Sequence, residues 1–191
     1  MSDTKIFDFS SFPVLTTERL TLRKPLMADA EDVLVFRGDA YVQRYNSEPI
    51  ASIKEAEEQI IDAHAEYGRH EGIPWAVTFT DSETTLGHFG LYHWSHNHRR
   101  AEAGYDLARA YWGQGIATEA LRAILHFGFT EMNLHRIYAG TIADNHESVR
   151  LLERLGFTLE GKKRESSWED DGTFHDSAMY GVLRREFGTE E

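Results

Sequence analysis

Apolar and polar residues alternate in several short stretches of the chain, which is the pattern expected of half-buried β-strands. In residues 18–26, Leu20 and Leu22 are separated by polar neighbours. Residues 74–80 and 86–95 are rich in β-branched or aromatic residues, and the polar stretch between them predicts a hairpin. The same reasoning predicts strands at 101–108 and 136–143, and a terminal hairpin of 158–169 and 173–184 around a turn at 170–172.

Apolar residues at helical spacing predict four helices, at residues 28–39, from 52 to either 68 or 72, at about 118–131 and at 145–157. Asp29 is a suitable N-cap for the first helix. Ser52 and Glu55 have the spacing of a capping box at the second. Asn145 is a suitable N-cap for the last helix, and Gly156 lies where a glycine commonly ends a helix.

These elements follow one another in the order β-α-α-β-β-β-α-β-α-β-β, which predicts a mixed α/β domain with a largely antiparallel sheet and one crossover. The chain has 191 residues, so we expect a single domain covering 1–191, with 1–14 as a flexible or loosely packed N-terminal extension. Hydrophobic residues make up 41% of the chain, which is enough for a full core. The absence of cysteine excludes disulfides, thiolate metal sites and a cysteine nucleophile.

The chain is acidic, with 20 Lys and Arg residues against 32 Asp and Glu residues and a net charge of −12. This charge disfavours nucleic acid as a partner, because such binding depends on neutralising phosphates. It mildly favours a cationic partner such as an amine or a basic peptide, although solubility alone also explains it. The first residues do not have the pattern of a signal peptide, and no apolar run reaches about 20 residues. We therefore expect a cytoplasmic protein with no membrane partner.

The stretch YWGQGIATEAL, residues 111–121, places two glycines directly before a predicted helix. One explanation is a loop that needs positive φ angles, which glycine adopts without a Cβ clash. The other is an anion site, in which bare backbone N–H groups and the helix N-terminus meet a phosphate. The spacing of Gly113 and Gly115 alone does not decide between the two.

Two motifs carry a family resemblance, WGQGIATEAL at 112–121 and NHESVRLLERLGF at 145–157. Their separation and element order resemble the GNAT superfamily of acyl-CoA-dependent N-acyltransferases. The resemblance runs from TERLTLRKPLMADAEDV near the N-terminus to GTFHDSAMYGVLRREF near the C-terminus. Trp112 stands where many members have Arg or Gln, and tryptophan there is familiar in the RimJ/RimL-type branch, which includes ribosomal-protein N-terminal acetyltransferases.

The resemblance implies the GNAT fold, a mixed α/β architecture with a mostly antiparallel sheet of seven strands, splayed at its central strands and flanked by about four helices. It also implies the activity, which is transfer of an acetyl group from acetyl-CoA to a primary amine by direct attack in a ternary complex. In the family, the loop at 112–118 cradles the pyrophosphate of coenzyme A. The resemblance therefore favours the anion site over the plain loop, and this binding requires no metal.

The cofactor-binding residues implied by the resemblance lie on three segments. Gly113 and Gly115 let the backbone approach the phosphates closely. Backbone N–H groups near Leu107 and Ala108 are expected to pair with the pantetheine arm and to stabilise the oxyanion. Asn145 is expected to bond the pantetheine amide as well as to cap its helix. The full set is Leu107, Ala108, Arg109, Trp112, Gly113, Gln114, Gly115, Ile116, Ala117, Thr118 and Asn145.

Two residues are candidates for catalysis. Glu102 lies on the strand that sits beside the thioester in the family, where a carboxylate often accepts the amine proton through a water. It could instead anchor the substrate or be a solvated strand residue. Ser148 matches the family position of a hydroxyl that reaches the sulfur, although a serine there also helps to cap a helix without any catalytic role. The tyrosine that fills this role elsewhere in the superfamily is replaced here by Leu152.

Four histidines gather in one stretch of the chain, at His88, His93, His96 and His98. Imidazoles are common zinc ligands, but no paired carboxylate pattern accompanies them, so no metal site is expected. We expect His93 and Trp94 to line the acceptor pocket, and Trp168 is a candidate wall of the same pocket.

The acceptor stays open between a protein N-terminus, a polyamine and an aminoacyl-type small molecule. The oligomeric state is open too, since a homodimer is common in this branch. The alternative function is a catalytically silent acyl-CoA-binding regulatory module on the same fold. The presence of Glu102, Asn145 and Ser148 argues against that alternative without excluding it.

Overall fold

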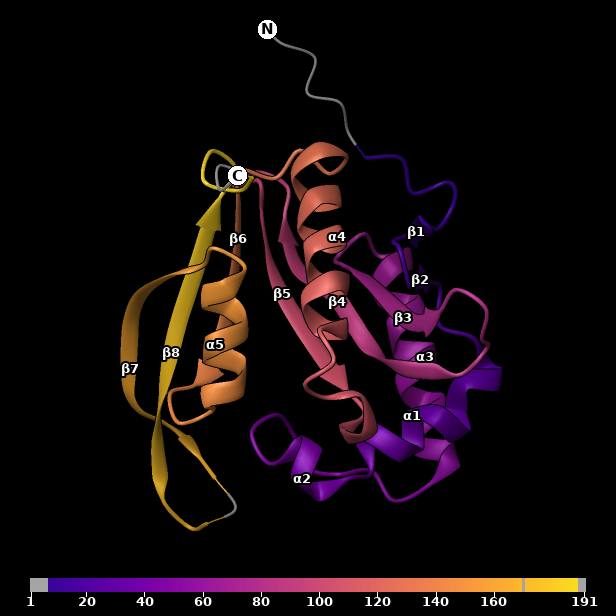
Figure 1. The fold of residues 1–191 in the computed structure, drawn as a ribbon, viewed down its shortest axis with the longest axis horizontal. Coiled ribbons are helices and arrows are strands. Elements are labelled where there is room, and N and C mark those ends of the chain that lie inside the picture. The colour runs from indigo at the N-terminus through magenta and orange to yellow at the C-terminus, as the bar shows by residue number, and fades with distance from the viewer. Residues whose placement is uncertain (1–6, 170, 189–191) are drawn as a thin grey trace, which may run out of the picture.

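One mixed sheet runs through the part of the chain that the computed structural model describes, residues 7–169 and 171–188 (Figure 1). Within these residues it has eight strands in the order β1-β2-β3-β4-β5-β6-β8-β7, and only the β5–β6 pair is parallel. The strands are β1 (Leu15–Thr16), β2 (Leu20–Arg23), β3 (Ile73–Phe79), β4 (Thr85–Ser95), β5 (Arg100–Leu107), β6 (Arg136–Ile142), β7 (Thr158–Trp168) and β8 (Phe174–Leu183).

Helices cover both faces of the sheet (Figure 1). In the described part of the chain there are five α-helices and two short 3₁₀ turns: α1 (Ala30–Arg37), α2 (Ala40–Gln43), α3 (Ile53–Gly68), α4 (Ile116–Thr130), α5 (His146–Arg154), η1 (Met27–Asp29) and η2 (Arg109–Tyr111). Helix α4 packs its apolar side against the larger core cluster, which includes Phe89 and Leu91 of β4. Helices α1 and α3 form a second cluster with each other, so each face of the sheet has its own core.

The mixed α/β fold and the largely antiparallel sheet are confirmed, but the expected numbers of seven strands and four helices are too low. Strand β1 is two residues long, which is too short to show any alternation. Helix α2 is a single turn capped by the Asp39 carboxylate, which accepts hydrogen bonds from the Tyr41 and Val42 amides. Elements this short depend on local polar contacts rather than on apolar periodicity. Asp170, at the predicted terminal turn, lies outside the described residues.

Two predicted helix caps are confirmed. The Ser52 hydroxyl accepts a hydrogen bond from the Glu55 amide at 3.3 Å, and α3 ends at Gly68. The Asn145 carboxamide oxygen accepts a hydrogen bond from the Ser148 amide at 3.2 Å. Gly156 has a φ of 83° just after α5, as expected of a terminal glycine.

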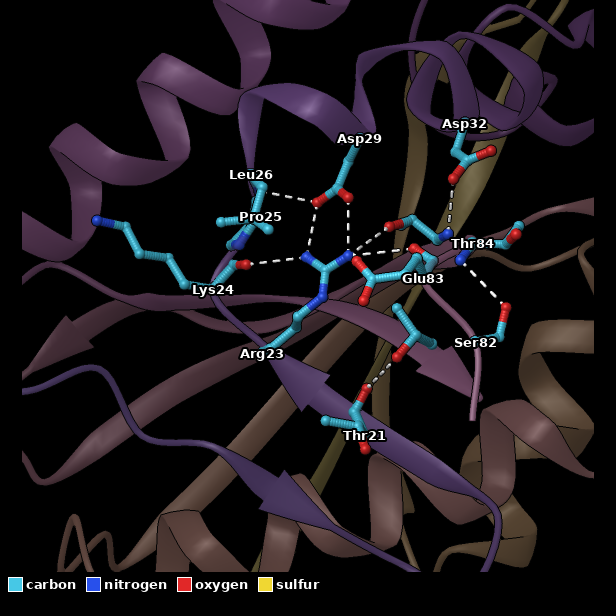
Figure 2. A network of polar contacts seen from close by, with 12 residues as sticks. Thr21, Arg23, Lys24, Pro25, Leu26, Asp29, Asp32, Ser82, Glu83 and Thr84 are labelled. Atoms are coloured by element: carbon cyan, nitrogen blue, oxygen red, sulfur yellow. Dashed lines mark hydrogen bonds and ion pairs between the residues drawn. The ribbon is translucent and has the colours of Figure 1, made fainter. Parts of the chain in front are cut away.

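Asp29 is the N-cap residue of α1 as predicted, but its carboxylate makes no capping hydrogen bond to that helix and is bound elsewhere (Figure 2). It accepts two hydrogen bonds from Arg23, both at 2.8 Å, and one from the Leu26 amide at 2.7 Å. Arg23 also donates to the Glu83 carbonyl, and the Asp32 carboxylate accepts from the Thr85 amide. This network fixes the start of α1 to the end of β2 and to the β3–β4 turn.

The N-terminal residues that the structure describes pack against the larger core cluster. The ring of Phe7 meets Phe127 of α4 at a centroid distance of 5.5 Å, and Phe12 lies 6.2 Å from Trp75. The Trp75 indole N–H donates to the Pro13 carbonyl at 2.8 Å. This segment therefore covers the ends of β3 and α4.

Strands β5 and β6 pair over only a short length. Their register joins Arg100 to Arg136, Ala101 to Ile137 and Glu102 to Tyr138, and then ends, whereas β6 pairs with β8 over its whole length. The two strands then diverge toward the end of the sheet where α4 and α5 begin (Figure 1). Residues 103–107 of β5 therefore have one edge that is not joined to β6.

We predict that Asp29→Asn lowers the free energy of unfolding by about 3 kcal/mol at neutral pH, because it leaves the partly buried Arg23 guanidinium without its charged partner. Burial alone would raise the pKa of Asp29, but the hydrogen bonds from Arg23 and the Leu26 amide outweigh it and the pKa is lowered. The stabilisation is therefore complete above the unfolded-state pKa of about 3.9 and is lost as pH falls through the lower native value. Urea titrations at several pH values between 7 and 3 measure how the free energy of unfolding of each variant changes with pH.

The matched control is Asp62→Asn, on an exposed position of α3, which should change the unfolding free energy by less than about 0.5 kcal/mol. The difference in the free energy of unfolding between the wild type and Asp29→Asn should become smaller below about pH 4. Equal and small losses for both variants would show that the Arg23–Asp29 pair does not stabilise this corner of the fold.

Candidate functional site

A cavity of about 530 Å³ lies where β5 and β6 separate. Its walls come from both strands, from the loop between η2 and α4, from α5 and from the segment after α2. Ala103 and Leu107 of β5 belong to the core cluster on the α4 face, while Glu102 and Asp106 alternate with them and face the other side. Because residues of both kinds line it, the cavity reaches both faces of the sheet.

The glycine loop forms one wall of this cavity. Gly113 and Gly115 have φ angles of 72° and 78°, in the left-handed region that favours glycine. Gly115 is the N-cap of α4 and provides no side-chain cap, so the first N–H groups of the helix have no partner within it. Ile116, Ala117 and Thr118, which carry these groups, all line the cavity. The loop thus has the backbone geometry of a phosphate cradle.

An ion pair neutralises the acidic side chain in the first turn of α4, which would otherwise oppose an anion bound there. Glu119 lies in the first turn of α4, and its carboxylate accepts hydrogen bonds from the Thr17 hydroxyl at 2.6 Å and from Arg19 Nε at 2.7 Å. Arg19 also donates to the Gln114 carbonyl at 3.2 Å. Arg19 therefore neutralises Glu119 and braces the loop from β2.

Leu107 and Ala108 were both predicted to act through their backbone amides, but only the Leu107 amide faces the open edge of β5. The Ala108 amide donates to the Leu86 carbonyl at 2.8 Å, so it serves the sheet. Leu107, the residue before it, lies opposite Gly87 of β4. Hydrogen-bonded and non-hydrogen-bonded pairs alternate along an antiparallel ladder, so the N–H and carbonyl of Leu107 point away from β4, toward the gap beside β6. The Trp112 indole N–H donates to that Leu107 carbonyl at 2.7 Å, which holds the loop against the strand.

Ser148 lies in the cavity wall and is joined to a residue that the sequence reasoning missed. Its hydroxyl oxygen is 2.7 Å from the hydroxyl oxygen of Tyr105, on β5. Burial raises the pKa of Tyr105 to about 12, so this phenol stays protonated. Leu152, at the position where the family resemblance implies a tyrosine in other members, is buried in the core. Only the alternation of AEAGYDLA, which places Tyr105 on the face opposite Glu102, could have indicated this contact.

Glu102 faces the opposite side of the cavity from Ser148's helix. Its carboxylate is 3.0 Å from Nδ1 of His93, whose side chain is 75% exposed. Asp106, the other carboxylate on this face, is bound by Arg37, Gln43 and Asn46. Glu102 is thus the carboxylate in the cavity that no arginine neutralises among the described residues.

Several predicted site residues lie outside the cavity. Trp94 stacks on His96 at 4.1 Å and packs against Phe9, and Trp168 is 63% exposed beside Phe174. Arg109 and Gln114 do not line the cavity either: the Arg109 guanidinium lies over the Tyr41 ring, and the Gln114 side-chain amide donates to the Ala110 carbonyl. The structure brings together Glu102, Leu107, Trp112, Gly113, Gly115, Ile116, Ala117, Thr118, Asn145 and Ser148.

Within residues 7–169 and 171–188, no group of three or more His, Cys, Asp or Glu side chains is arranged to hold a metal ion. Nε2 of His96 donates a hydrogen bond to the His70 carbonyl at 3.1 Å, and His88 is buried next to Phe36. In the same part of the chain, no helix has the length and apolar character needed to cross a membrane.

Comparison with known proteins shows which family this chain resembles. The acetyltransferase (GNAT) domain matches residues 19–158. The uncharacterized N-acetyltransferase YoaA of Bacillus subtilis is 34% identical over 174 residues, covering 91% of this chain and 98% of that protein. A GNAT-family acetyltransferase structure from Bacillus anthracis superimposes with a TM-score of 0.80 at 26% identity, covering 91% of this chain and 100% of that one.

A further solved structure shares the fold and holds coenzyme A. It is RimL, the ribosomal L7/L12 alpha-N-protein acetyltransferase, in complex with coenzyme A, with a TM-score of 0.82 at 21% identity, covering 90% of this chain and 98% of that one. The domain match spans more than half of the chain, and the similarity to YoaA spans nearly all of it. The chain therefore belongs to the GNAT acetyltransferase family and is an acyltransferase that uses acetyl-CoA.

Proposed function

We propose that this protein transfers the acetyl group of acetyl-CoA to a primary amine by direct attack in a ternary complex, in the manner of the RimJ/RimL-type branch. One observation carries the proposal: a single cavity joins the glycine loop on one face of the sheet to Glu102 on the other. Donor and acceptor can therefore enter from opposite faces and meet in the gap between β5 and β6. The acceptor is a protein N-terminus, a polyamine or an aminoacyl-type small molecule, and the net charge of −12 favours a cationic one.

The donor side is built from main-chain groups. The free amides at the start of α4 and the glycine backbone suit a diphosphate, and the helix adds partial positive charge at its N-terminus. The exposed edge of β5 suits an extended arm that carries amides, because it offers the Leu107 N–H in strand geometry. The same N–H is suitably placed to stabilise an oxyanion at the end of that arm.

The acceptor side must generate a neutral amine. Alkyl amines titrate near 10.4 and α-amino groups near 8, so most of the amine is protonated at pH 7. We assign Glu102 as the general base that takes this proton, directly or through a water. Arg37 neutralises Asp106, which leaves Glu102 as the carboxylate with free acceptor capacity on this face. Anchoring of the ammonium form by Glu102 is the alternative role.

The departing sulfur requires a proton when the tetrahedral intermediate collapses. We assign Ser148 as the donor of that proton. We assign the Tyr105 hydroxyl as the donor in its 2.7 Å hydrogen bond with the serine oxygen, which directs the serine proton toward the cavity while Tyr105 itself stays protonated. The amine proton thus passes to Glu102 and on to solvent, the sulfur takes its proton from Ser148, and solvent returns a proton to Ser148 when the products leave, so the transfers balance over one turnover.

A thiol-release assay with a panel of acceptors tests the proposed function. The purified protein is mixed with acetyl-CoA and N-terminal peptides, polyamines or aminoacyl nucleotides, and free thiol is followed together with the mass of the acceptor. Acetylated amine with stoichiometric thiol supports the proposal. A silent acyl-CoA-binding module would bind coenzyme A and release no thiol above background with any acceptor.

Gly115→Val should abolish coenzyme A binding while the fold persists. The substitution adds a Cβ at a φ of 78° and places a branched side chain over the phosphate cradle. Loss of two charge-assisted hydrogen bonds predicts that Kd rises roughly 100-fold or more, measured by isothermal titration calorimetry. Gly172→Val is the matched control, because it carries the same backbone strain at a φ of 75° outside the cavity. Retained affinity in Gly115→Val would place the phosphates elsewhere.

Ser148→Ala should lower kcat by about 100-fold without weakening coenzyme A binding, as expected when an acid catalyst is lost. Tyr105→Phe should lower kcat by about tenfold, and the double variant should be no slower than Ser148→Ala, because Tyr105 acts through Ser148. Tyr67→Phe, which loses a hydroxyl bonded to the Ser11 carbonyl outside the cavity, is the control. Equal losses in kcat and in affinity would make Ser148 a binding residue.

Glu102→Gln should lower kcat by about 100-fold and leave KM for the amine nearly unchanged, because the amide cannot accept the proton. Steady-state kinetics with the best acceptor of the panel give both constants. Glu31→Gln, on the exposed side of α1, removes the same charge far from the cavity and should have no effect. A rise in KM with unchanged kcat would identify Glu102 as the substrate anchor instead.

A further inference from the structure

Strand β4 has a β-bulge beside the cavity. Tyr92 of β4 lies opposite Glu102 of β5, and the next pair joins Ser95 to Arg100. Positions 93 and 94 of β4 therefore face only position 101 of β5, which is one extra residue on β4. His93, inside the bulge, has a φ of 50°, in the left-handed region that a histidine rarely adopts. In a regular strand His93 would face away from Glu102, but the bulge brings its ring to that carboxylate.

The two oxygens of the Glu102 carboxylate have different surroundings. Nδ1 of His93 lies 3.0 Å from Oε2. Oε1 lies 3.9 Å from the position that a Cβ would take at Gly140, a residue of β6 that lines the cavity across the gap. His93 itself does not line the cavity, and its side chain is 75% exposed. Glu102 therefore connects the cavity to an imidazole that faces solvent.

A second carboxylate, that of Glu66 on α3, also lies near His93. Burial raises the pKa of Glu66, and the charge of a protonated His93 opposes that effect. The Glu71 carboxylate, in the turn after α3, accepts a hydrogen bond from Arg69 Nε at 2.7 Å. Of these acidic groups, Glu102 is the one that the structure joins to His93 by a hydrogen bond.

The contact matters because a carboxylate is a weak final acceptor for an amine proton. In model peptides imidazole is the stronger base by about two pKa units. A proton that moves from a carboxylic acid to an imidazole is therefore drawn away from the amine, and the carboxylate recovers its negative charge. An imidazole bonded to one oxygen of the base can remove the proton while the acceptor occupies the cavity side.

We propose that His93 takes the acceptor's proton from Glu102 and passes it to solvent. The proposal rests on the proposed function, in which Glu102 is the general base. The amine proton bonds to Oε1, the carboxyl group rotates, and the O–H bond breaks as the Nδ1–H bond forms. The exposed imidazolium then loses a proton to water, and exchange with water leaves Nδ1 unprotonated again. His93 acts through Glu102 and is therefore a positioning residue that relays a proton.

Two substitutions that accept a positive φ distinguish a relay from a structural contact. His93→Gly keeps the backbone conformation and leaves room for imidazole added to the buffer. His93→Asn also suits a φ of 50° and can keep an N–H near the place of Nδ1, but an amide does not carry a proton onward. His98→Gly and His98→Asn, at an exposed histidine in the turn after β4, are the matched controls. Thermal melts establish that each variant is folded.

Both His93 variants should lose about tenfold or more in kcat, whereas KM for the amine and Kd for coenzyme A stay nearly unchanged. Imidazole should restore kcat of His93→Gly in proportion to its concentration and should not affect His93→Asn. The wild-type kcat should fall at the pH at which histidine side chains become protonated, about 6.5 in model peptides. In His93→Asn this fall should move to lower pH, where carboxylates titrate.

A wild-type kcat in His93→Asn would show that the contact only orients Glu102 and would overturn the relay. A loss of kcat in His93→Gly that imidazole does not restore, or a rise in KM alone, would overturn it as well. Full activity of Glu102→Gln would remove the base on which the relay depends. Absence of acetyl transfer by the wild type with every acceptor would instead overturn the proposed function.

Discussion

The site depends on the early end of the pairing between β5 and β6. A parallel ladder that continued past Glu102 and Tyr138 would satisfy the edge of β5 with β6 and close the sheet. Because β6 follows β8 over its whole length instead, residues 103–107 keep one edge of backbone groups outside the ladder. An extended ligand with its own amides can satisfy that edge. The same gap lets one cavity reach both faces of the sheet.

The remaining structure holds the edges of this gap in place through ion pairs that cross between elements. Arg19 ties the glycine loop to β2 through Glu119 and the Gln114 carbonyl. Arg37 ties the end of β5 to α1 through Asp106. The cavity is thus framed by partly buried charge pairs, in which loss of one partner costs more than the pair itself contributes. This arrangement fixes the loop and the strand edge before any ligand binds, which lowers the entropic cost of binding.

Apolar periodicity and the glycine motif predicted the seven long strands, the four long helices and the loop that forms one cavity wall, because those features are encoded within short windows of the chain. Asp29 stands at the N-cap of α1 as predicted, but its carboxylate does not cap the helix because Arg23 and the Leu26 amide bind it. The placement of Trp94 failed similarly, since its ring packs against Phe9, more than eighty residues earlier. A sequence motif shows which type of side chain stands at a position, but the packing of the folded chain decides which residue that side chain contacts.

Tyr105 shows why the catalytic assignment needed the structure. The sequence presents the loss of the usual tyrosine at Leu152 as a gap to be filled by Ser148 alone. In the fold, a partly buried phenol from β5 reaches the Ser148 hydroxyl from the opposite wall, so a phenol lies beside Ser148 but comes from a different element. A serine hydroxyl by itself is a weak acid, whereas a hydroxyl that accepts a hydrogen bond while it donates is a better one. The contact between β5 and α5 across the gap therefore links the strand separation to the proposed chemistry, because the divergence of β5 and β6 also leaves room for Tyr105 to lie between the two walls.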